Sequence, residues 1–316
     1  MSRSWSFSVL LFLAAIPLVL SGCHFKASNP NVDDTPTAGR AIILADMDAR
    51  PVIAEEAAVF SSIYPNAELV VRYMGESELL SAMMSDSVRC VVISAATGGK
   101  QQTWFDKRQL SAPVVPIYTD AIAVVVGPSS PLKQLDIAQI KALLNADTNA
   151  LPVATAVSGD QAIITLHALF PGSGSGVART LIDSLHIQSV RASALPDVAA
   201  VIAQVAKDPR AIGFIPFAAI SDLDNPGMRA LRGQVKLLPL ARATDAEAVL
   251  PSQSAIADCR YPLRRRMTMI LTEGKSGLGT GFVSFVANHK GQRIILKLGV
   301  APITVPPRNI EMVPEQ

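Results

Sequence analysis

The chain has 316 residues, of which 49% are hydrophobic and 17% are charged, and its formal net charge is +2. This length suggests about two domains, or one large domain, with a sizeable core. The near-neutral balance gives no electrostatic reason to expect nucleic acid or another polyanion as a partner.

The first 22 residues are typical of a secretory signal peptide. Arg3 supplies a positive charge, an apolar stretch follows, and residues 20–23 read Leu-Ser-Gly-Cys. This ending resembles the lipobox of bacterial lipoproteins, in which cleavage precedes the cysteine and lipid is attached to it. We therefore expect a lipidated Cys23 and a chain anchored to a membrane of the cell envelope, facing the periplasm or the cell surface. The alternative is an ordinary secreted protein in which the position of Cys23 is accidental.

Residues 23–40 are polar and rich in turn-forming residues, and they predict a flexible linker. From residue 41 onward, short apolar runs alternate with helical patterns. Strands are expected at 41–45, 67–73 and 90–94, with one helix opening at Pro51 and another at 76–84. This β-α-β-α-β order predicts a parallel sheet with helices packed on it.

The second half of the chain continues the α/β pattern. Residues 120–126 form a long apolar strand, and further strands are expected at 162–166, 211–215, 235–238 and 267–271. Helices are expected at 137–144, 177–185, 198–206 and 282–298, the last one interrupted near Gly291. The pattern as a whole favours two α/β lobes.

A glycine- and serine-rich loop lies between an expected strand and an expected helix. It contains Ser173, Gly174, Ser175 and Gly176. A helix start leaves backbone N–H groups unpaired and carries the positive end of the helix dipole, so phosphate, sulfate or carboxylate fits such a loop. Arg179 follows one turn after Ser175 and could add positive charge from the same face. A plain flexible loop with Ser175 as the N-cap explains these residues equally well.

No complete catalytic, metal or cofactor motif accompanies this loop. The G-x-S-x-G nucleophile motif is absent because Gly174 takes its middle position. A hydrolase needs a nucleophile paired with a base, and no segment offers that pair. The four histidines show no i,i+4 pair, which argues against a metal site. We therefore expect a protein that is not an enzyme and that uses no cofactor or metal.

Other polar and thiol-bearing residues are given structural interpretations. His167 is expected to pack within the core, and residues 264–266, three consecutive arginines, are expected to form a solvated turn, with an anion or partner site as the less favoured alternative. Cys90 and Cys259 are expected to be small buried residues rather than a disulfide.

Several segments fall in an order that matches one known family. They are the apolar strand 120–126, the loop 172–176, the Ala-Ile-Gly-Phe strand at 211–214, Tyr-Pro-Leu at 261–263 with the strand 267–271, and the terminal segment 281–302. Together they resemble the PstS-like phosphate-binding proteins, which are type 2 periplasmic binding proteins. The resemblance covers about 41–305 and looks closest to lipoprotein members from Bacteroidetes-type bacteria.

The resemblance implies an α/β fold with two lobes, in which mixed, mainly parallel sheets carry flanking helices and a cleft lies between the lobes. The lobes would comprise 41–124 with 265–305, and 125–264, followed by a tail at 306–316. Such a protein closes around its ligand by hinge motion and hands it to the permease of an ABC importer.

The resemblance also implies a ligand site for phosphate or a related small oxyanion. The expected ligand-binding residues are Asp48, Ser94, Ser173, Gly174, Ser175, Gly176 and Arg179. An acid such as Asp48 can accept a hydrogen bond from a protonated phosphate oxygen, which helps to exclude sulfate.

The chain departs from the family pattern at two places. No arginine stands beside Ser94, and the first loop carries Asp46 and Asp48 where members often have Gly, Ser or Thr. These departures favour an alternative function, a surface scaffold or partner-binding module that keeps the two-lobe fold with a degraded anion site.

Overall fold

The computed structural model describes residues 34–94, 97–145, 150–154, 161–188 and 190–305. The signal peptide, Cys23, most of the expected linker and the C-terminal tail lie outside the described residues. Residues 34–38, at the end of the expected linker, lie against helix α10 (Leu278–Ala287), where Asp34 Oδ1 accepts a hydrogen bond of 2.8 Å from Leu278 N.

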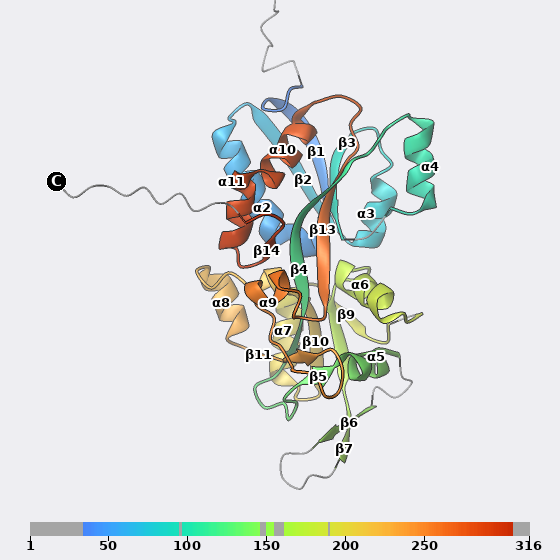
Figure 1. Cartoon of the computed structure of the whole chain (residues 1–316), viewed down its shortest axis with the longest axis vertical. Helices are drawn as coiled ribbons and strands as arrows, with labels where there is room; N and C mark the ends of the chain where they lie inside the picture. Colours follow the sequence, from blue (N-terminus) through green and yellow to red (C-terminus); the bar gives the residue numbers. More distant parts are fainter. Residues whose placement is uncertain (1–33, 95–96, 146–149, 155–160, 189, 306–316) are drawn as a thin grey trace, which may run out of the picture.

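One end of the molecule is a parallel sheet covered by helices on both faces (Figure 1). Strand β1 (Gly39–Asp46) lies between β2 (Ala67–Met74) and β3 (Val88–Ile93), which confirms the predicted β-α-β-α-β unit. Neighbouring residues of β1 are buried on opposite faces: Ile43 packs in the cluster under one set of helices, and Leu44 in the cluster under the other. The helices are α2 (Arg50–Ile63), α10 and α11 (His289–Lys297) on the first face, and α3 (Glu76–Ala82) and α4 (Gly99–Lys107) on the second.

Two long antiparallel strands lead from this sheet to the other end of the molecule (Figure 1). Strand β13 (Arg264–Leu271) pairs with β3 on one side and with β4 (Val114–Val126) on the other. The remainder of β4 pairs with β10 (Ala211–Pro216), so a single strand belongs to both halves of the sheet. The sequence predicted β4 only from residue 120, because its first six residues are less apolar.

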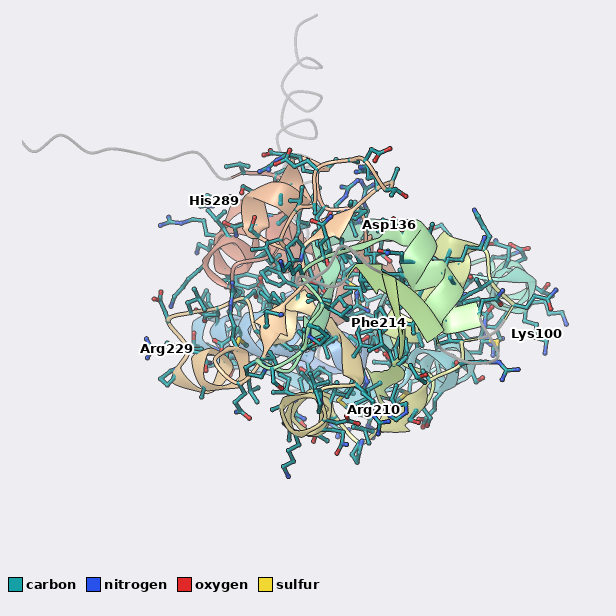
Figure 2. All side chains as sticks on the ribbon, turned by 90° about the horizontal axis from the view of Figure 1, so that it is seen from below. Lys100, Asp136, Arg210, Phe214, Arg229 and His289 are labelled. Atoms are coloured by element: carbon teal, nitrogen blue, oxygen red, sulfur yellow. The ribbon has the colours of Figure 1, made fainter. Side chains whose placement is uncertain are left out.

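The second lobe is built around the far end of β4. Here β10 runs antiparallel to β4 and parallel to β8 (His167–Pro171), which pairs in turn with β9 (Ser193–Leu195). Phe214 lies inside this lobe (Figure 2) and stacks on Phe170, with ring centroids 5.1 Å apart. The helices here are α5 (Ile137–Asn145), α6 (Gly176–Leu185), α7 (Val198–Lys207), α8 (Pro226–Arg232) and α9 (Gln253–Ala257).

Short elements complete the structure. They are the 3₁₀ turns η2 (Met47–Ala49) and η3 (Phe217–Ala219), the hairpin β6 (Ala150–Ala154) and β7 (Gln161–Thr165), and the two-residue strands β5 (Leu135–Asp136), β11 (Lys236–Leu237), β12 (Leu240–Ala241) and β14 (Ala301–Pro302). The expected α/β fold class, with two lobes on a mixed sheet and flanking helices, is confirmed.

The structure corrects three expectations. The three arginines at 264–266 do not form a solvated turn: they begin β13, and Arg265 is buried. His167 is not in the core, because it starts β8 at an exposed end, with Nδ1 3.5 Å from Asp208 Oδ2. The terminal helix breaks at Asn288 rather than at Gly291, since Asn288 is extended and caps α11.

Cys90 and Cys259 are both free thiols. Cys90 is buried in β3, as expected, whereas Cys259 is exposed just after α9. They therefore form no disulfide.

Candidate functional site

The start of α6 faces the first lobe. Its loop turns sharply because Gly172 and Gly174 have positive φ values of 77° and 78°, a conformation that favours glycine. Ser175 is the N-cap, which was one of the two interpretations of this loop, and its Oγ accepts a hydrogen bond of 3.1 Å from Val177 N. The helix forms because Val177, Leu181 and Leu185 recur on one buried face.

A carboxylate from the first lobe occupies this helix start. Val177 N donates a hydrogen bond of 3.0 Å to Asp48 Oδ2, and Ser175 Oγ donates one of 3.3 Å to the same atom. Asp48 reaches α6 because it lies in η2, directly after β1, and it is only 4% exposed. The start of α6, at Ser175 and Val177, therefore binds a carboxylate that the chain itself supplies.

Arg265 ties this contact to the long strands. Its Nη1 lies 2.8 Å from Asp48 Oδ2, and its Nη2 lies 2.9 Å from Asp120 Oδ2 on β4. The second oxygen of Asp120 accepts a hydrogen bond of 3.0 Å from Ala218 N. Burial disfavours the charge on Arg265, yet the Asp48 and Asp120 carboxylates together raise its pKa above the ordinary value.

Asp46 lies behind this network in a crowded acidic environment. Its Oδ1 accepts a hydrogen bond of 3.2 Å from Asp48 N, whereas its buried Oδ2 has no hydrogen-bond partner among the described residues. Burial and then the charge of Asp48 raise the pKa of Asp46 well above its usual range, which favours the protonated form. A Cβ atom at Gly176 would lie 2.1 Å from Asp46 Oδ2, so the two lobes meet here only because residue 176 is glycine.

Ser94 and Glu76 form a second contact region beside α6. Glu76 Oε1 accepts hydrogen bonds from Ser94 N at 3.1 Å and from Ser94 Oγ at 3.0 Å. Arg179 Nε lies 3.9 Å from Glu76 Oε2 and 3.7 Å from Asp183 Oδ2. The backbone of α3 also reaches the loop, since Glu76 N donates a hydrogen bond of 3.0 Å to Gly174 O.

Two cavities flank these contacts. The larger one, here called the apolar cavity, has a volume of about 480 Å³ and is bordered by Asp48, Ser173 and Ser175. The smaller one, here called the basic cavity, has a volume of about 220 Å³ and is bordered by Ser94 and Arg179. The predicted site residues are thus divided between two cavities, while Gly174 and Gly176 serve the contact between lobes and border neither.

Sequence reasoning missed Glu76 and Asp120, and it gave the anion site at residues 264–266, which include Arg265 and Arg266, only as the less favoured alternative. The strand periodicity of 264–271 offered one signal, because alternation places Arg265 on the face opposite to Arg264 and Arg266. The burial of Glu76 and Asp120 offered none, since their partners are distant in the sequence.

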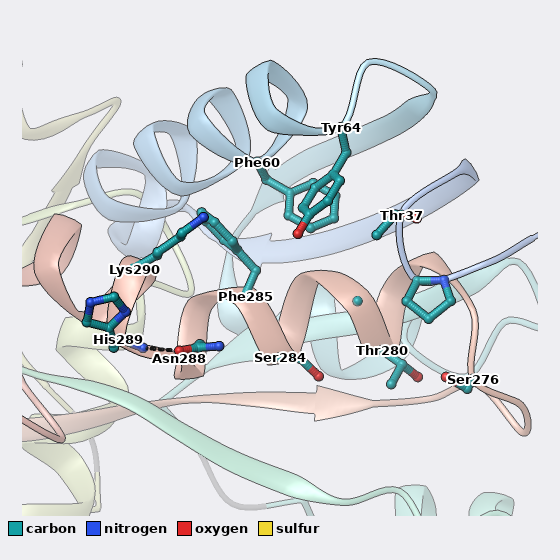
Figure 3. A pocket seen from close by; sticks show the side chains of 12 residues that line it. Thr37, Phe60, Tyr64, Ser276, Thr280, Ser284, Phe285, Asn288, His289 and Lys290 are labelled. Atoms are coloured by element: carbon teal, nitrogen blue, oxygen red, sulfur yellow. Dashed lines mark hydrogen bonds between the residues drawn. The ribbon is translucent and has the colours of Figure 1, made fainter. Parts of the chain in front are cut away.

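A third cavity, of about 380 Å³, lies in the first lobe between α2 and the α10–α11 pair (Figure 3). Phe60, Tyr64 and Phe285 border its apolar side, and Asn288, His289 and Lys290 border its polar end. Its lining comes from the first lobe alone, so it plays no part in the contact between lobes.

The described part of the chain contains no group of His, Cys, Asp and Glu side chains able to hold a metal ion. Within that same part, each helix is too short or too polar to cross a membrane.

Comparisons with known proteins agree with this architecture. A family model described as the PBP superfamily domain, for periplasmic binding proteins, matches residues 32–290. A search of curated protein sequences finds no match.

Three solved structures share the fold at low identity. The first is the structure, with bound phosphate, of a protein from Clostridium perfringens provisionally described as a phosphate ABC transporter substrate-binding protein. It is 18% identical at a TM-score of 0.66, and the match covers 84% of this chain and 100% of that one. An ABC-type phosphate transport receptor from Vibrio cholerae is 14% identical at a TM-score of 0.63, with 84% and 100% covered. A mutant of OxyR from Corynebacterium glutamicum, bound to H2O2, is 13% identical at a TM-score of 0.52, with 92% and 74% covered. At such low identity the likeness establishes the fold alone.

Proposed function

Because the chain belongs to the PBP superfamily, we propose that it is an extracytoplasmic solute-binding protein that holds phosphate or a related small oxyanion between its two lobes. It is a binding protein and not an enzyme. In this proposal Cys23 carries the lipid anchor, and an ABC permease receives the ligand. The lobes comprise 41–124 with 265–305, and 125–264. The observation that carries the proposal is the basic cavity.

The basic cavity has the size and the donors that a tetrahedral oxyanion needs. Arg179, Arg265 and Arg266 border it, together with the hydroxyl groups of Ser94, Thr180 and Ser184. One guanidinium group can donate two parallel hydrogen bonds to two oxygens of a phosphate, which makes arginine well suited to this ligand. Arg266 is exposed and forms no ion pair with the described residues.

The acidic residues of the same cavity support selectivity for a protonated anion. Glu76 and Asp183 border the cavity beside the arginines. A carboxylate accepts a hydrogen bond from monohydrogen phosphate but repels sulfate, which has no proton at neutral pH. This assigns to Glu76 and Asp183 the acceptor role that the sequence suggested for Asp48.

The glycine- and serine-rich loop at the start of α6 is already occupied by a side chain of the protein. Asp48 already accepts the hydrogen bonds of Ser175 and Val177, so an external anion must displace this carboxylate to bind there. Ligand binding by Ser173, Gly174, Ser175 and Gly176 stays a prediction, and Asp48→Asn is the variant that tests it.

Isothermal titration with phosphate at neutral pH tests the proposal. We expect binding by the unmodified chain and at least about tenfold weaker binding after Arg266→Gln or Arg179→Gln, because each change removes a charge-assisted hydrogen bond. Arg264→Gln is the matched control, since Arg264 belongs to the same strand but does not border the cavity. Equal affinity in all three variants contradicts the basic cavity as the site. An affinity that rises only in Asp48→Asn places the anion at α6 instead.

A scaffold or partner-binding module is the second candidate function. The contact of Asp48 with α6 favours it, because this contact joins the lobes without any external ligand. Pull-down from membranes distinguishes the two functions: recovery of a permease supports transport. The scaffold function requires the absence of phosphate binding at millimolar concentration, together with recovery of envelope proteins of another class.

A further inference from the structure

The apolar cavity receives residues from both lobes. The first lobe contributes η2, the first turns of α2 and Gly75, and the second lobe contributes the segments before α6 and α7, the first turn of α7, η3 and α8. Its apolar lining consists of Met47, Pro51, Ala54, Pro171, Pro196, Val198, Ala199, Ala219 and Met228. A ligand held here touches both lobes at once.

The size and lining of this cavity do not suit an inorganic anion. Its volume of about 480 Å³ is more than twice the 220 Å³ of the basic cavity. Binding sites for organic molecules span about 300–1,000 Å³ and are mostly apolar with a few polar groups. A phosphate ion has no apolar surface to pack against such a lining, whereas an aliphatic chain packs on it and removes apolar surface from water, which is favourable.

The charges that border the apolar cavity select the polar group of the ligand. Asp48, Glu55 and Asp197 are acidic, and Arg50 is the basic residue among the lining residues. The guanidinium group of Arg50 lies 5.5 Å above the ring of Tyr73. Asp48 forms an ion pair with Arg265, and Asp197 caps α7 by accepting a hydrogen bond of 2.8 Å from Ala200 N. Glu55 makes no hydrogen bond or ion pair with the described residues, so its charge is available.

We propose that the apolar cavity binds a small organic amine, with its aliphatic body against the Met47 and Met228 side and its ammonium group near Glu55. This site goes beyond the proposed oxyanion function, because it uses a different cavity with an opposite charge preference. Opposite charges attract the amine to Glu55, while a carboxylate of the same chain length is repelled by this unpaired charge.

Methyl NMR of methionine tests this site directly, since Met47 and Met228 border the cavity whereas Met83 and Met269 are buried elsewhere. The probes are n-hexylamine, n-hexanol and hexanoate, each titrated into the protein. We expect the amine to shift the Met47 and Met228 signals at a concentration at least about fivefold lower than the alcohol, and the carboxylate to bind most weakly. The Met83 and Met269 signals serve as internal references.

Two variants separate charge from shape. Glu55→Gln is expected to weaken hexylamine binding about three- to tenfold and to leave hexanol binding unchanged, whereas Glu78→Gln, an exposed change on α3, should alter neither. Ala199→Trp should abolish binding of both by filling the cavity. Equal affinity for amine and carboxylate, or shifts that survive Ala199→Trp, overturn the proposal. Phosphate titration of the same variants tests the oxyanion function separately. Phosphate affinity should not change in them, because neither Glu55 nor Ala199 borders the basic cavity.

Discussion

Single side chains decide what the junction between the lobes can bind. The Asp48 carboxylate takes the hydrogen bonds that the Gly/Ser loop offers, and it reaches them because Arg265 compensates its charge. Gly176 makes the approach possible, since Asp46 Oδ2 lies where a Cβ atom would stand. The chemistry of the α6 start is therefore set by residues from distant parts of the sequence.

At this scale we expect Gly176→Ala to destabilise the protein by about 1–3 kcal/mol, because the added methyl group overlaps Asp46. The loss is larger if the overlap forces the two lobes apart. Urea denaturation measures the change. Gly99→Ala is the matched control: a Cβ atom there has no heavy-atom neighbour within 4 Å, so the variant should be neutral or slightly stabilised. A stability of Gly176→Ala equal to that of the unmodified chain contradicts this packing.

At the scale of elements, helix α2 carries an unusual buried acid. Its inward face contains Val52, Ile53 and Phe60, and also Glu56. Both Glu56 carboxylate oxygens lack a hydrogen-bond partner among the described residues. Burial raises the pKa of Glu56 from 4.5 to about 9, so the folded protein holds a proton there at neutral pH.

The pH dependence follows from this raised pKa. Between 4.5 and about 9 the folded state binds a proton that the unfolded state has released, so stability falls as pH rises through this window. We expect Glu56→Gln to remove the dependence and to stabilise the protein by up to about 3 kcal/mol at pH 7, with little effect at pH 4. Urea denaturation at several pH values tests this, with the exposed Glu78→Gln as control. A stabilisation that does not change with pH would contradict a protonated Glu56.

At the scale of the whole molecule, Arg265 connects the loop after β1 with the long strand β4 that both lobes share. It pairs with Asp48 from the first-lobe loop and with Asp120 on the strand that both lobes share. All three side chains are at least 96% buried, so water is not available to solvate their charges if an ion pair breaks.

We expect Arg265→Gln to cost about 3–5 kcal/mol, because removing one member of a buried ionic network leaves the other charges uncompensated. The adjacent Arg266→Gln should change stability by less than about 0.5 kcal/mol, since that side chain is exposed. Thermal or urea unfolding of the two variants provides the comparison. Similar losses in both would mean that the network does not hold the lobes.

Local patterns in the sequence determined most of the elements and the fold class. The apolar run of β1, the helical period of α6 and its Ser175 cap are properties of neighbouring residues, and the structure shows each of them. The order of these elements was enough to indicate two α/β lobes. Signals were weakest where an element is polar, as in α4, or short, as in β9.

Tertiary structure alone decided the site. Asp48, Asp120, Ser175 and Arg265 come from four separate elements, and no local pattern encodes their meeting. The sequence supplied an anion-binding helix start, but only the packing of the lobes placed an internal carboxylate on it and left two cavities beside it. Charge pairing and burial depend on distances between remote residues, and those distances exist only once the chain has folded.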